Sequence, residues 1–187
     1  MKRIIIGITG ASGVIFGIKI LEALKGKVES HLIITKHAKE LITLETSYNI
    51  NQVSSLGNYV YDNDRLTAPI ASGTFKTEGM IILPCSIKTL SAIANSFCDS
   101  LLIRAADVTL KEKRKLVLGV RETPFHFGHL ELMMKISEIG GIIFPPLPAF
   151  YFKPQTIDDI INHIVGKILD LFQIDYKYLK RWEGINI

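Results

Sequence analysis

Short apolar runs alternate along the chain with longer segments in which polar side chains recur every three or four positions. Apolar runs that end in glycine, hydroxyl or charged residues are typical of strands buried on both faces of a parallel sheet. Five such runs occur: Arg3 to Ile8, His31 to Ile34, Met80 to Leu83, Val117 to Val120 and Gly141 to Phe144. We therefore predict five strands.

Helical periodicity follows the first strand and is clearest near the C-terminus. After the first strand, polar residues recur three apart among apolar ones, and Gly26 is a typical helix stop. The last helix is predicted behind a Thr156 cap. Its buried face is expected to comprise Ile157, Ile160, Ile161, Ile164, Ile168, Leu171 and Phe172.

Strands that alternate with helices, without internal repeats, predict the fold class. We expect a single α/β domain over residues 1–187, with a doubly wound, mostly parallel sheet in a Rossmann-like or flavodoxin-like three-layer sandwich. Residues 45–78 are less regular and rich in turn formers, so we interpret them as a long excursion that serves as a lid or a subunit contact.

Composition excludes several classes of protein. The chain has 187 residues, of which 48% are hydrophobic and 21% charged, so it can bury a large core and is not disordered. Two cysteines cannot build a disulfide framework, and no apolar run is long enough to span a membrane. The net charge is +4, but lysine and arginine are interspersed with aspartate and glutamate, and this pattern argues against nucleic-acid binding. Since Gly7 and Gly10 interrupt the first apolar run, we expect no signal peptide and a cytoplasmic location.

The residues just beyond the predicted strands indicate where chemistry should occur, because ligands of open parallel sheets bind past the carboxyl ends of the strands. Glycine, hydroxyl, cationic and aromatic residues stand there, and they suit a phosphorylated aromatic ligand. Gly7, Gly10 and Gly13 form a GxxGxxG turn between a strand and a helix. This turn favours nucleotide or flavin phosphate binding, and the alternative is close packing of helix and strand.

Nicotinamide enzymes are a rival class. An NAD enzyme would need an acidic residue after the second strand, where Thr35, Lys36 and His37 stand instead. Lys36 could bind a 2′-phosphate, so an NADPH reductase stays open. The Tyr-x-x-x-Lys pair of such reductases occurs only as Tyr176 and Lys180, in the tail, and we interpret it as a chance match.

Further candidates are less specific. Arg121 and Glu122 follow a buried strand, where a cation could hold phosphate and a carboxylate could move a proton, although a structural ion pair explains them equally well. We interpret Cys85 as a buried structural cysteine. His126 and His129 lack a third ligand at metal spacing, so no metal site is expected and capping or solvent contact is favoured. Trp182 and Tyr178 could dock on their own core or on a neighbouring subunit.

Several motifs together resemble one family, the UbiX/Pad1 flavin prenyltransferases. They are GITGASG at 7–13, ASGTF at 71–75, GMIILPCSIKTL at 79–90, RAADVTLKEKRKLVLGVRETP at 104–124 and PPLPAFY at 145–151, in the family's order. The resemblance implies a metal-independent transfer of a dimethylallyl group from dimethylallyl monophosphate to reduced FMN. The prenylated FMN would serve a partner UbiD-type decarboxylase. The family's members are homododecamers with sites at subunit junctions.

The resemblance also implies roles for individual residues. The residues expected to bind FMN are Gly10, Ala11, Ser12, Thr35, Ser86, Ile87, Lys88, Thr89 and Arg121. Tyr151 and Lys167 would bind the allyl phosphate, although Lys167 stands where many members have arginine. The catalytic set would be Glu122, Ser12, Lys111 and Arg104, with Glu122 as the carboxylate that accepts the proton lost by the flavin.

Two alternatives remain open. The first is a non-catalytic FMN-binding subunit of a decarboxylase, which would need the flavin residues but not Lys111, Glu122, Tyr151 and Lys167. The second is a cysteine-type flavin decarboxylase, which relies on an active-site histidine. No histidine lies between His37 and His126, and this spacing weighs against the second alternative.

Overall fold

The computed structural model describes residues 1–184, which form two compact units. The first unit is Met1–Pro145 and the second begins at Pro146. The expectation of one domain over the whole chain stays a prediction, and the two units are described in turn.

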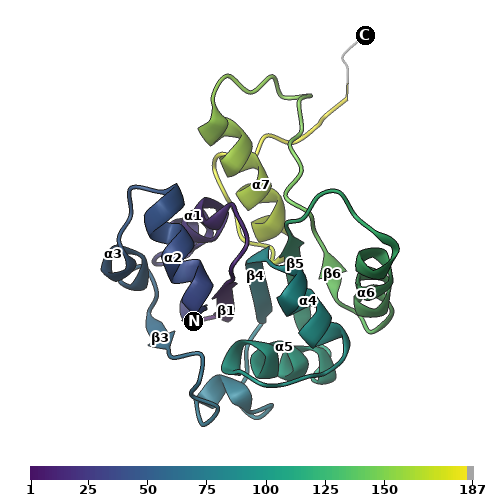
Figure 1. Cartoon of the computed structure of the whole chain (residues 1–187). Coiled ribbons are helices and arrows are strands. Elements are labelled where there is room, and N and C mark those ends of the chain that lie inside the picture. Colours follow the sequence, from purple (N-terminus) through teal and green to yellow (C-terminus); the bar gives the residue numbers. More distant parts are fainter. Residues whose placement is uncertain (185–187) are drawn as a thin grey trace. The chain divides into compact units, whose positions relative to one another are not determined.

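The first unit is built on a six-stranded sheet in which every pairing is parallel (Figure 1). Its order is β3-β2-β1-β4-β5-β6. From β1 to β3 the chain adds strands toward one edge of the sheet, and from β4 to β6 it adds them toward the other edge. The strands are β1 (Arg3–Ile8), β2 (Glu29–Ile34), β3 (Tyr59–Tyr61), β4 (Gly79–Cys85), β5 (Lys115–Val120) and β6 (Ile142–Ile143). All five predicted strands are confirmed, and β3 was missed.

Helices cover both faces of this sheet, as the predicted three-layer sandwich requires. On one face α1 contacts α2, and on the other α4 contacts α5 and α6 (Figure 1). The helices and the 3-10 turn η1 of this unit are α1 (Val14–Leu24), α2 (Lys36–Glu45), α3 (Ile50–Ser54), η1 (Pro69–Ala71), α4 (Ile87–Ala94), α5 (Leu101–Lys111) and α6 (Phe127–Glu138). The predicted excursion at 45–78 thus contains a helix, an edge strand and a turn.

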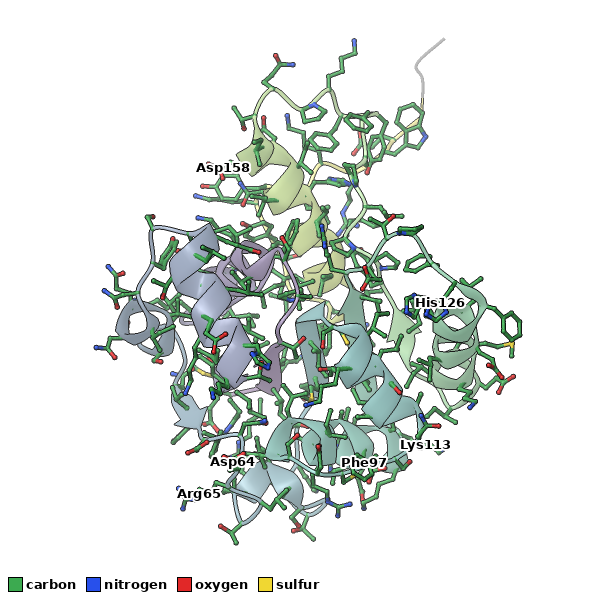
Figure 2. All side chains as sticks on the ribbon, viewed as in Figure 1. Asp64, Arg65, Phe97, Lys113, His126 and Asp158 are labelled. Atoms are coloured by element: carbon green, nitrogen blue, oxygen red, sulfur yellow. The ribbon has the colours of Figure 1, made fainter. Side chains whose placement is uncertain are left out.

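Alternate side chains of the strands divide the core between the two faces. Ile5, Met80 and Leu118 belong to the apolar cluster against α4 to α6, whereas Ile8 faces Gly17 of α1. Gly17 allows α1 to approach β4 closely, because a Cβ there would lie 2.3 Å from the carbonyl oxygen of Leu83. Side chains fill the remaining space, and residues such as Phe97 and His126 lie exposed at the surface of this unit (Figure 2).

The second unit consists of α7 (Ile157–Leu171) and the segments on either side of it. Thr156 caps α7 as predicted: its hydroxyl accepts the Asp159 N–H at 3.1 Å, and the Asp159 carboxylate accepts the Thr156 N–H at 2.9 Å. The helix buries Ile161, Ile164 and Ile168, but Ile157 is 78% exposed, so its place on the buried face was wrong. Ile157 is the first residue of the helix and precedes the stretch of α7 that packs.

The tail after α7 folds back along the helix. Gly166 provides the space, since a Cβ there would lie 2.8 Å from the Cβ of Leu179. The Tyr176 hydroxyl donates to Oδ1 of Asn162 at 2.7 Å, and Arg181 pairs with Asp170. No helix among residues 1–184 has both the length and the apolar character needed to cross a bilayer.

Candidate functional site

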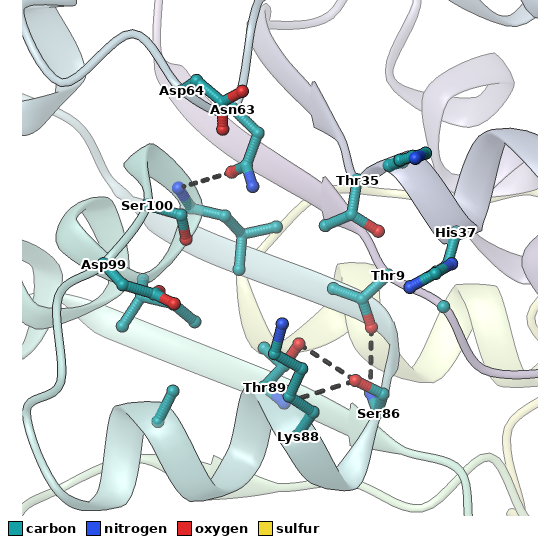
Figure 3. A pocket seen from close by; sticks show the side chains of 15 residues that line it. Thr9, Thr35, His37, Asn63, Asp64, Ser86, Lys88, Thr89, Asp99 and Ser100 are labelled. Atoms are coloured by element: carbon teal, nitrogen blue, oxygen red, sulfur yellow. Dashed lines mark hydrogen bonds between the residues drawn. The ribbon is translucent and has the colours of Figure 1, made fainter.

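A cavity lies at the carboxyl ends of β1, β2 and β4, where the strand order reverses (Figure 3). It has a volume of about 400 Å³. Fifteen residues line it: Thr9, Gly10, Thr35, Lys36, His37, Asn63, Asp64, Ser86, Lys88, Thr89, Ala92, Asp99, Ser100, Leu102 and Ile103. Five of the predicted FMN residues are therefore together: Gly10, Thr35, Ser86, Lys88 and Thr89.

Two helices begin at this cavity, and each has a hydroxyl cap. The Thr35 hydroxyl accepts the Ala38 N–H of α2 at 3.4 Å, and the Ser86 hydroxyl accepts the Thr89 N–H of α4 at 3.3 Å. The first turn of a helix carries unpaired N–H groups and a partial positive charge. The cavity therefore offers an anionic group two helix N-termini, together with the side chains of Lys36 and Lys88.

Buried hydrogen bonds hold the turn that carries Ser86. The Thr9 hydroxyl donates to the carbonyl of Pro84 at 2.8 Å. It also accepts the Ser86 N–H at 2.9 Å (Figure 3). Because Thr9 follows β1 and Ser86 follows β4, one side chain fixes two neighbouring strand ends. Thr9 was not among the residues predicted to bind FMN.

The opposite wall comes from segments that sequence reasoning missed. Asn63 follows β3, its carbonyl accepts the Leu101 N–H at 2.7 Å, and its Oδ1 accepts the Leu102 N–H at 3.0 Å. These bonds bring the excursion onto the start of α5. They place Asn63 and Asp64 beside Asp99 and Ser100 (Figure 3). No local motif marks these polar residues, because they meet only through the tertiary fold.

Close packing, the alternative interpretation of the glycine turn, applies to Gly7 and Gly10, and phosphate binding by the turn stays a prediction. Gly7 serves packing, since a Cβ there would lie 3.0 Å from Leu102. Gly10 lines the cavity, and a Cβ there would lie 2.7 Å from the Cβ of His37. Gly13 has a left-handed φ of 95°, and its N–H donates to a carboxylate oxygen of Glu45 at 2.8 Å. Glu45, the last residue of α2, is thus a partner of the turn that the sequence did not identify.

The other predicted FMN residues lie outside this cavity. Ala11 and Ser12 belong to the turn next to Gly10, and Ser12 is exposed. Ile87 begins α4 and packs against the apolar cluster. Arg121 is exposed, and its N–H donates to the carbonyl of Cys85 at 3.1 Å.

Arg104 and Lys111 line a second cavity in the same unit, with a volume of about 610 Å³. The ASGTF loop forms its other wall: Arg104 donates to the carbonyl of Ala71 at 3.2 Å, and Arg114 donates to the carbonyl of Gly73 at 2.7 Å. Lys111 is paired with Glu112. Four cationic side chains line this space, namely Lys76, Arg104, Lys111 and Arg114, against the one carboxylate of Glu112. The arrangement suits a second anionic group.

Glu122 is half-buried directly after β5, and one of its carboxylate oxygens accepts the Thr123 N–H at 2.9 Å. Arg121 does not pair with it: the ion pairs within residues 1–184 do not join these two side chains. A structural Arg121–Glu122 ion pair, which the sequence left open, is therefore not formed in this structure.

Tyr151 and Lys167 belong to the second unit. The Tyr151 hydroxyl lies 3.1 Å from Nε2 of His163 and donates to the carbonyl of Lys180 at 3.4 Å. Its ring contacts Trp182, with centroids 5.7 Å apart, so Trp182 docks within its own chain. A cavity of about 400 Å³ lies beside Tyr151 and is lined also by Lys180 and Arg181. Lys167 is exposed on α7.

The remaining candidates have structural roles. Cys85 is fully buried, and burial raises the pKa of its thiol, as expected for a structural cysteine. His126 caps α6 by accepting the Gly128 N–H at 3.1 Å, and its ring lies 3.6 Å from that of His129. Within residues 1–184, no cluster of three or more His, Cys, Asp or Glu side chains has the arrangement of a metal site.

Comparisons with known proteins bear on this arrangement. The family model described as Flavoprotein matches residues 1–169. A flavin prenyltransferase UbiX of Thauera aromatica is 56% identical over 183 residues, which are 97% of this chain and 94% of that protein.

Two solved structures have nearly the same fold. A crystal structure of AnUbiX in complex with FMN and dimethylallyl pyrophosphate matches with a TM-score of 0.97 and 47% identity, over 99% of both chains. A dodecameric FMN-dependent Ubix-like decarboxylase of Escherichia coli O157:H7 matches with a TM-score of 0.95 and 46% identity, over 97% of this chain and 100% of that one.

Proposed function

This chain belongs to the UbiX family of flavin prenyltransferases, and from that membership we propose that it transfers a dimethylallyl group from dimethylallyl monophosphate to reduced FMN. The product, prenylated FMN, serves a UbiD-type decarboxylase. The observation that carries the proposal is the cavity at the strand reversal, where two capped helix N-termini meet beside a glycine turn.

The residues of this cavity fit FMN. Gly10 lets the turn lie directly against His37, which also lines the cavity, and the donors suit a phosphate: the hydroxyls of Thr35, Ser86 and Thr89 and the ammonium of Lys88. Ala11 and Ser12 supply neighbouring turn backbone, Ile87 supplies the first turn of α4, and Arg121 a nearby cation. Reduced flavin supplies an electron-rich carbon that can attack the allyl group.

The cationic residues act on the leaving phosphate. As the allylic carbon–oxygen bond breaks, negative charge grows on the phosphate, and nearby cations stabilise that charge more in the transition state than in the ground state. We assign this role to Lys111 and Arg104, whose cavity carries four cations, and to Lys167 with the Tyr151 hydroxyl. Ser12 adds a hydroxyl donor. No metal ion is required in this scheme.

Glu122 accepts the proton that the flavin loses after the new bond forms. One of its carboxylate oxygens accepts the Thr123 N–H, and the other oxygen is left for proton transfer. Because reduced FMN and allyl phosphates are intracellular metabolites, we expect the reaction in the cytoplasm.

Assembly forms part of the proposal. The flavin cavity and the Arg104–Lys111 cavity share no lining residue within the first unit. A relative with 46% identity is dodecameric. We therefore propose a homododecamer in which neighbouring copies bring the two groups of residues into one site.

Mass spectrometry of the released flavin tests the function. The protein is incubated anaerobically with reduced FMN and dimethylallyl monophosphate, and we expect a flavin heavier by one C5H8 unit that restores activity to a flavin-free UbiD-type decarboxylase. Bound FMN that stays unchanged would instead indicate the non-catalytic subunit. Release of carbon dioxide from a C-terminal cysteine peptide would indicate the cysteine decarboxylase.

A further inference from the structure

His163 has an environment that packing alone does not explain. It is 3% exposed, its ring stacks on Phe152 with centroids 4.4 Å apart, and its Nε2 lies 3.1 Å from the Tyr151 hydroxyl. Its other nitrogen, Nδ1, is buried and has no hydrogen-bond partner in the described structure. An unpaired buried nitrogen costs stability, and an apolar side chain would avoid that cost. A histidine at this position therefore makes its hydrogen bond to Tyr151 at a cost in the stability of the second unit.

One tautomer of this histidine satisfies both contacts of the Tyr151 hydroxyl. The Tyr151 hydroxyl has one proton, and it donates that proton to the carbonyl of Lys180, which can only accept. With the hydroxyl proton on this carbonyl, Nε2 of His163 carries a hydrogen and donates to the Tyr151 oxygen, and Nδ1 is a bare acceptor. Burial, and then the charge of Lys167, lowers the pKa of His163, which agrees with a neutral ring.

We infer that His163 is a positioning residue. Its Nε2–H donates to the Tyr151 oxygen, so that the single hydroxyl proton points away from the helix and can be donated in a hydrogen bond to a phosphate oxygen of the allyl substrate. This inference rests on the proposed function. Two further observations support it. The cavity beside Tyr151 is lined by Lys180, by Arg181, which is paired with Asp170, and by Glu183. Lys167 lies one helical turn after His163, on the same face of α7.

In this arrangement the carbonyl of Lys180 is a temporary acceptor. At 3.4 Å it makes a long bond, which a charged phosphate oxygen can replace with a shorter and stronger one. His163 keeps the Tyr151 oxygen in place during that exchange. Without this bond the hydroxyl could rotate and turn its proton elsewhere.

Two substitutions separate positioning from packing. His163→Phe keeps the ring volume and removes the donor, and we expect kcat/KM for dimethylallyl monophosphate to fall about tenfold, mainly through KM. His163→Gln places an amide N–H near the position of Nε2 and should recover most of that loss. FMN affinity should be unchanged in both variants. Should His163→Phe fail to fold, His163→Asn replaces it, because its shorter amide cannot reach Tyr151.

A double-mutant cycle with Tyr151→Phe decides the matter. If His163 acts through Tyr151, then His163→Phe adds nothing to the loss already caused by Tyr151→Phe. Independent losses that multiply in the double variant would overturn the inference, as would equal losses in His163→Phe and His163→Gln.

A binding measurement keeps the inference separate from the proposed function. The rise in melting temperature that dimethylallyl monophosphate causes in the FMN-loaded protein should be lost in His163→Phe and restored in His163→Gln. If the wild type forms no prenylated flavin but shows this pattern, the proposed function is wrong and the positioning role stands. If the variants and the wild type respond equally, the positioning role is wrong.

Discussion

The Thr9 hydroxyl shows how one side chain can determine the geometry of a site without touching the reacting atoms. It joins the end of β1 to the turn after β4 through two buried hydrogen bonds, to the Pro84 carbonyl and from the Ser86 N–H. The cap of α4 therefore has a defined position before any ligand binds. Such preorganisation is what an anion site needs, because its donors do not have to be reoriented on binding.

Glu122 is the side chain whose charge matters most for the proposed chemistry. We expect Glu122→Gln to keep FMN binding and to lower formation of prenylated FMN about a hundredfold or more, because the amide cannot accept the proton. Mass spectrometry of the flavin under single-turnover conditions measures the rate. Glu131→Gln, at an exposed position of α6, is the matched control and should react at the wild-type rate.

Equal rates in Glu122→Gln and wild type would show that the carboxylate takes no part in proton transfer. Melting temperatures of both variants are needed, since an unfolded Glu122→Gln would lower the rate for a different reason.

The pairing of β2 with the edge strand β3 contains a buried histidine that makes stability depend on pH. His31 is bonded through Nδ1 to the Tyr61 hydroxyl at 2.9 Å and through Nε2 to Glu29 at 3.0 Å, and Glu29 is also held by Arg3 at 2.8 Å. Burial lowers the pKa of His31 from its ordinary 6.5, although Glu29 opposes the shift. The hydrogen bond from Arg3 is the main cause of a lowered pKa at Glu29.

We predict that the free energy of unfolding falls as the pH drops below about 6.5. In that range His31 binds a proton more readily in the unfolded chain than in the folded chain. His163 lowers the free energy of unfolding in the same way. Below pH 4.5 the lowered pKa of Glu29 adds a further loss. Urea denaturation between pH 8 and pH 5 measures the slope.

His31→Gln should reduce that slope, whereas His37→Gln should leave it unchanged, because the His37 side chain is 74% exposed. A slope that is the same in wild type and His31→Gln would assign the pH dependence to other groups.

The contact of α1 with β4 depends on a glycine that has no unusual backbone angle. An alanine at position 17 would place its Cβ 2.3 Å from the Leu83 carbonyl and 2.9 Å from Ile8, and a strand carbonyl cannot move aside. We expect Gly17→Ala to lower the free energy of unfolding by about 3 kcal/mol. Gly26→Ala is the comparison: it has free space but a φ of +75°, so a loss of about 1 kcal/mol is expected.

Chemical denaturation of both variants at one pH gives the two values. If Gly17→Ala were no less stable than Gly26→Ala, the helix could move away from the strand at little cost, and α1 would not be held as closely as described.

The whole molecule exposes large apolar side chains that association would cover. Leu44, Phe97 and Phe127 are at least 64% exposed, and 48% of the sequence is hydrophobic. We predict that light scattering gives a mass near twelve times that of one chain, as in the dodecameric relative. A monomer at micromolar concentration that still formed prenylated FMN would contradict both the assembly and the shared site.

The element order could be read from the sequence because each buried strand is a continuous apolar run and each helix has a periodic face or a cap. Thr156 was recognisable as a cap for the same local reason, whereas the caps Thr35 and Ser86 were found only in the structure. Such patterns depend only on contiguous residues. The edge strand β3 could not be recognised, because Tyr59 and Val60 are exposed and form a strand only by pairing with β2.

The site was predictable on one side only. Gly10, Thr35, Ser86, Lys88 and Thr89 follow strands and were expected at the cavity, whereas Asn63, Asp64, Asp99 and Ser100 arrive from loops that are distant in sequence. The backbone bond between Asn63 and Leu101 brings those loops together. Hydrophobic periodicity and capping act within a few residues and are therefore written in the sequence. The meeting of two polar loops depends on how the completed core packs, and it became visible only in the folded chain.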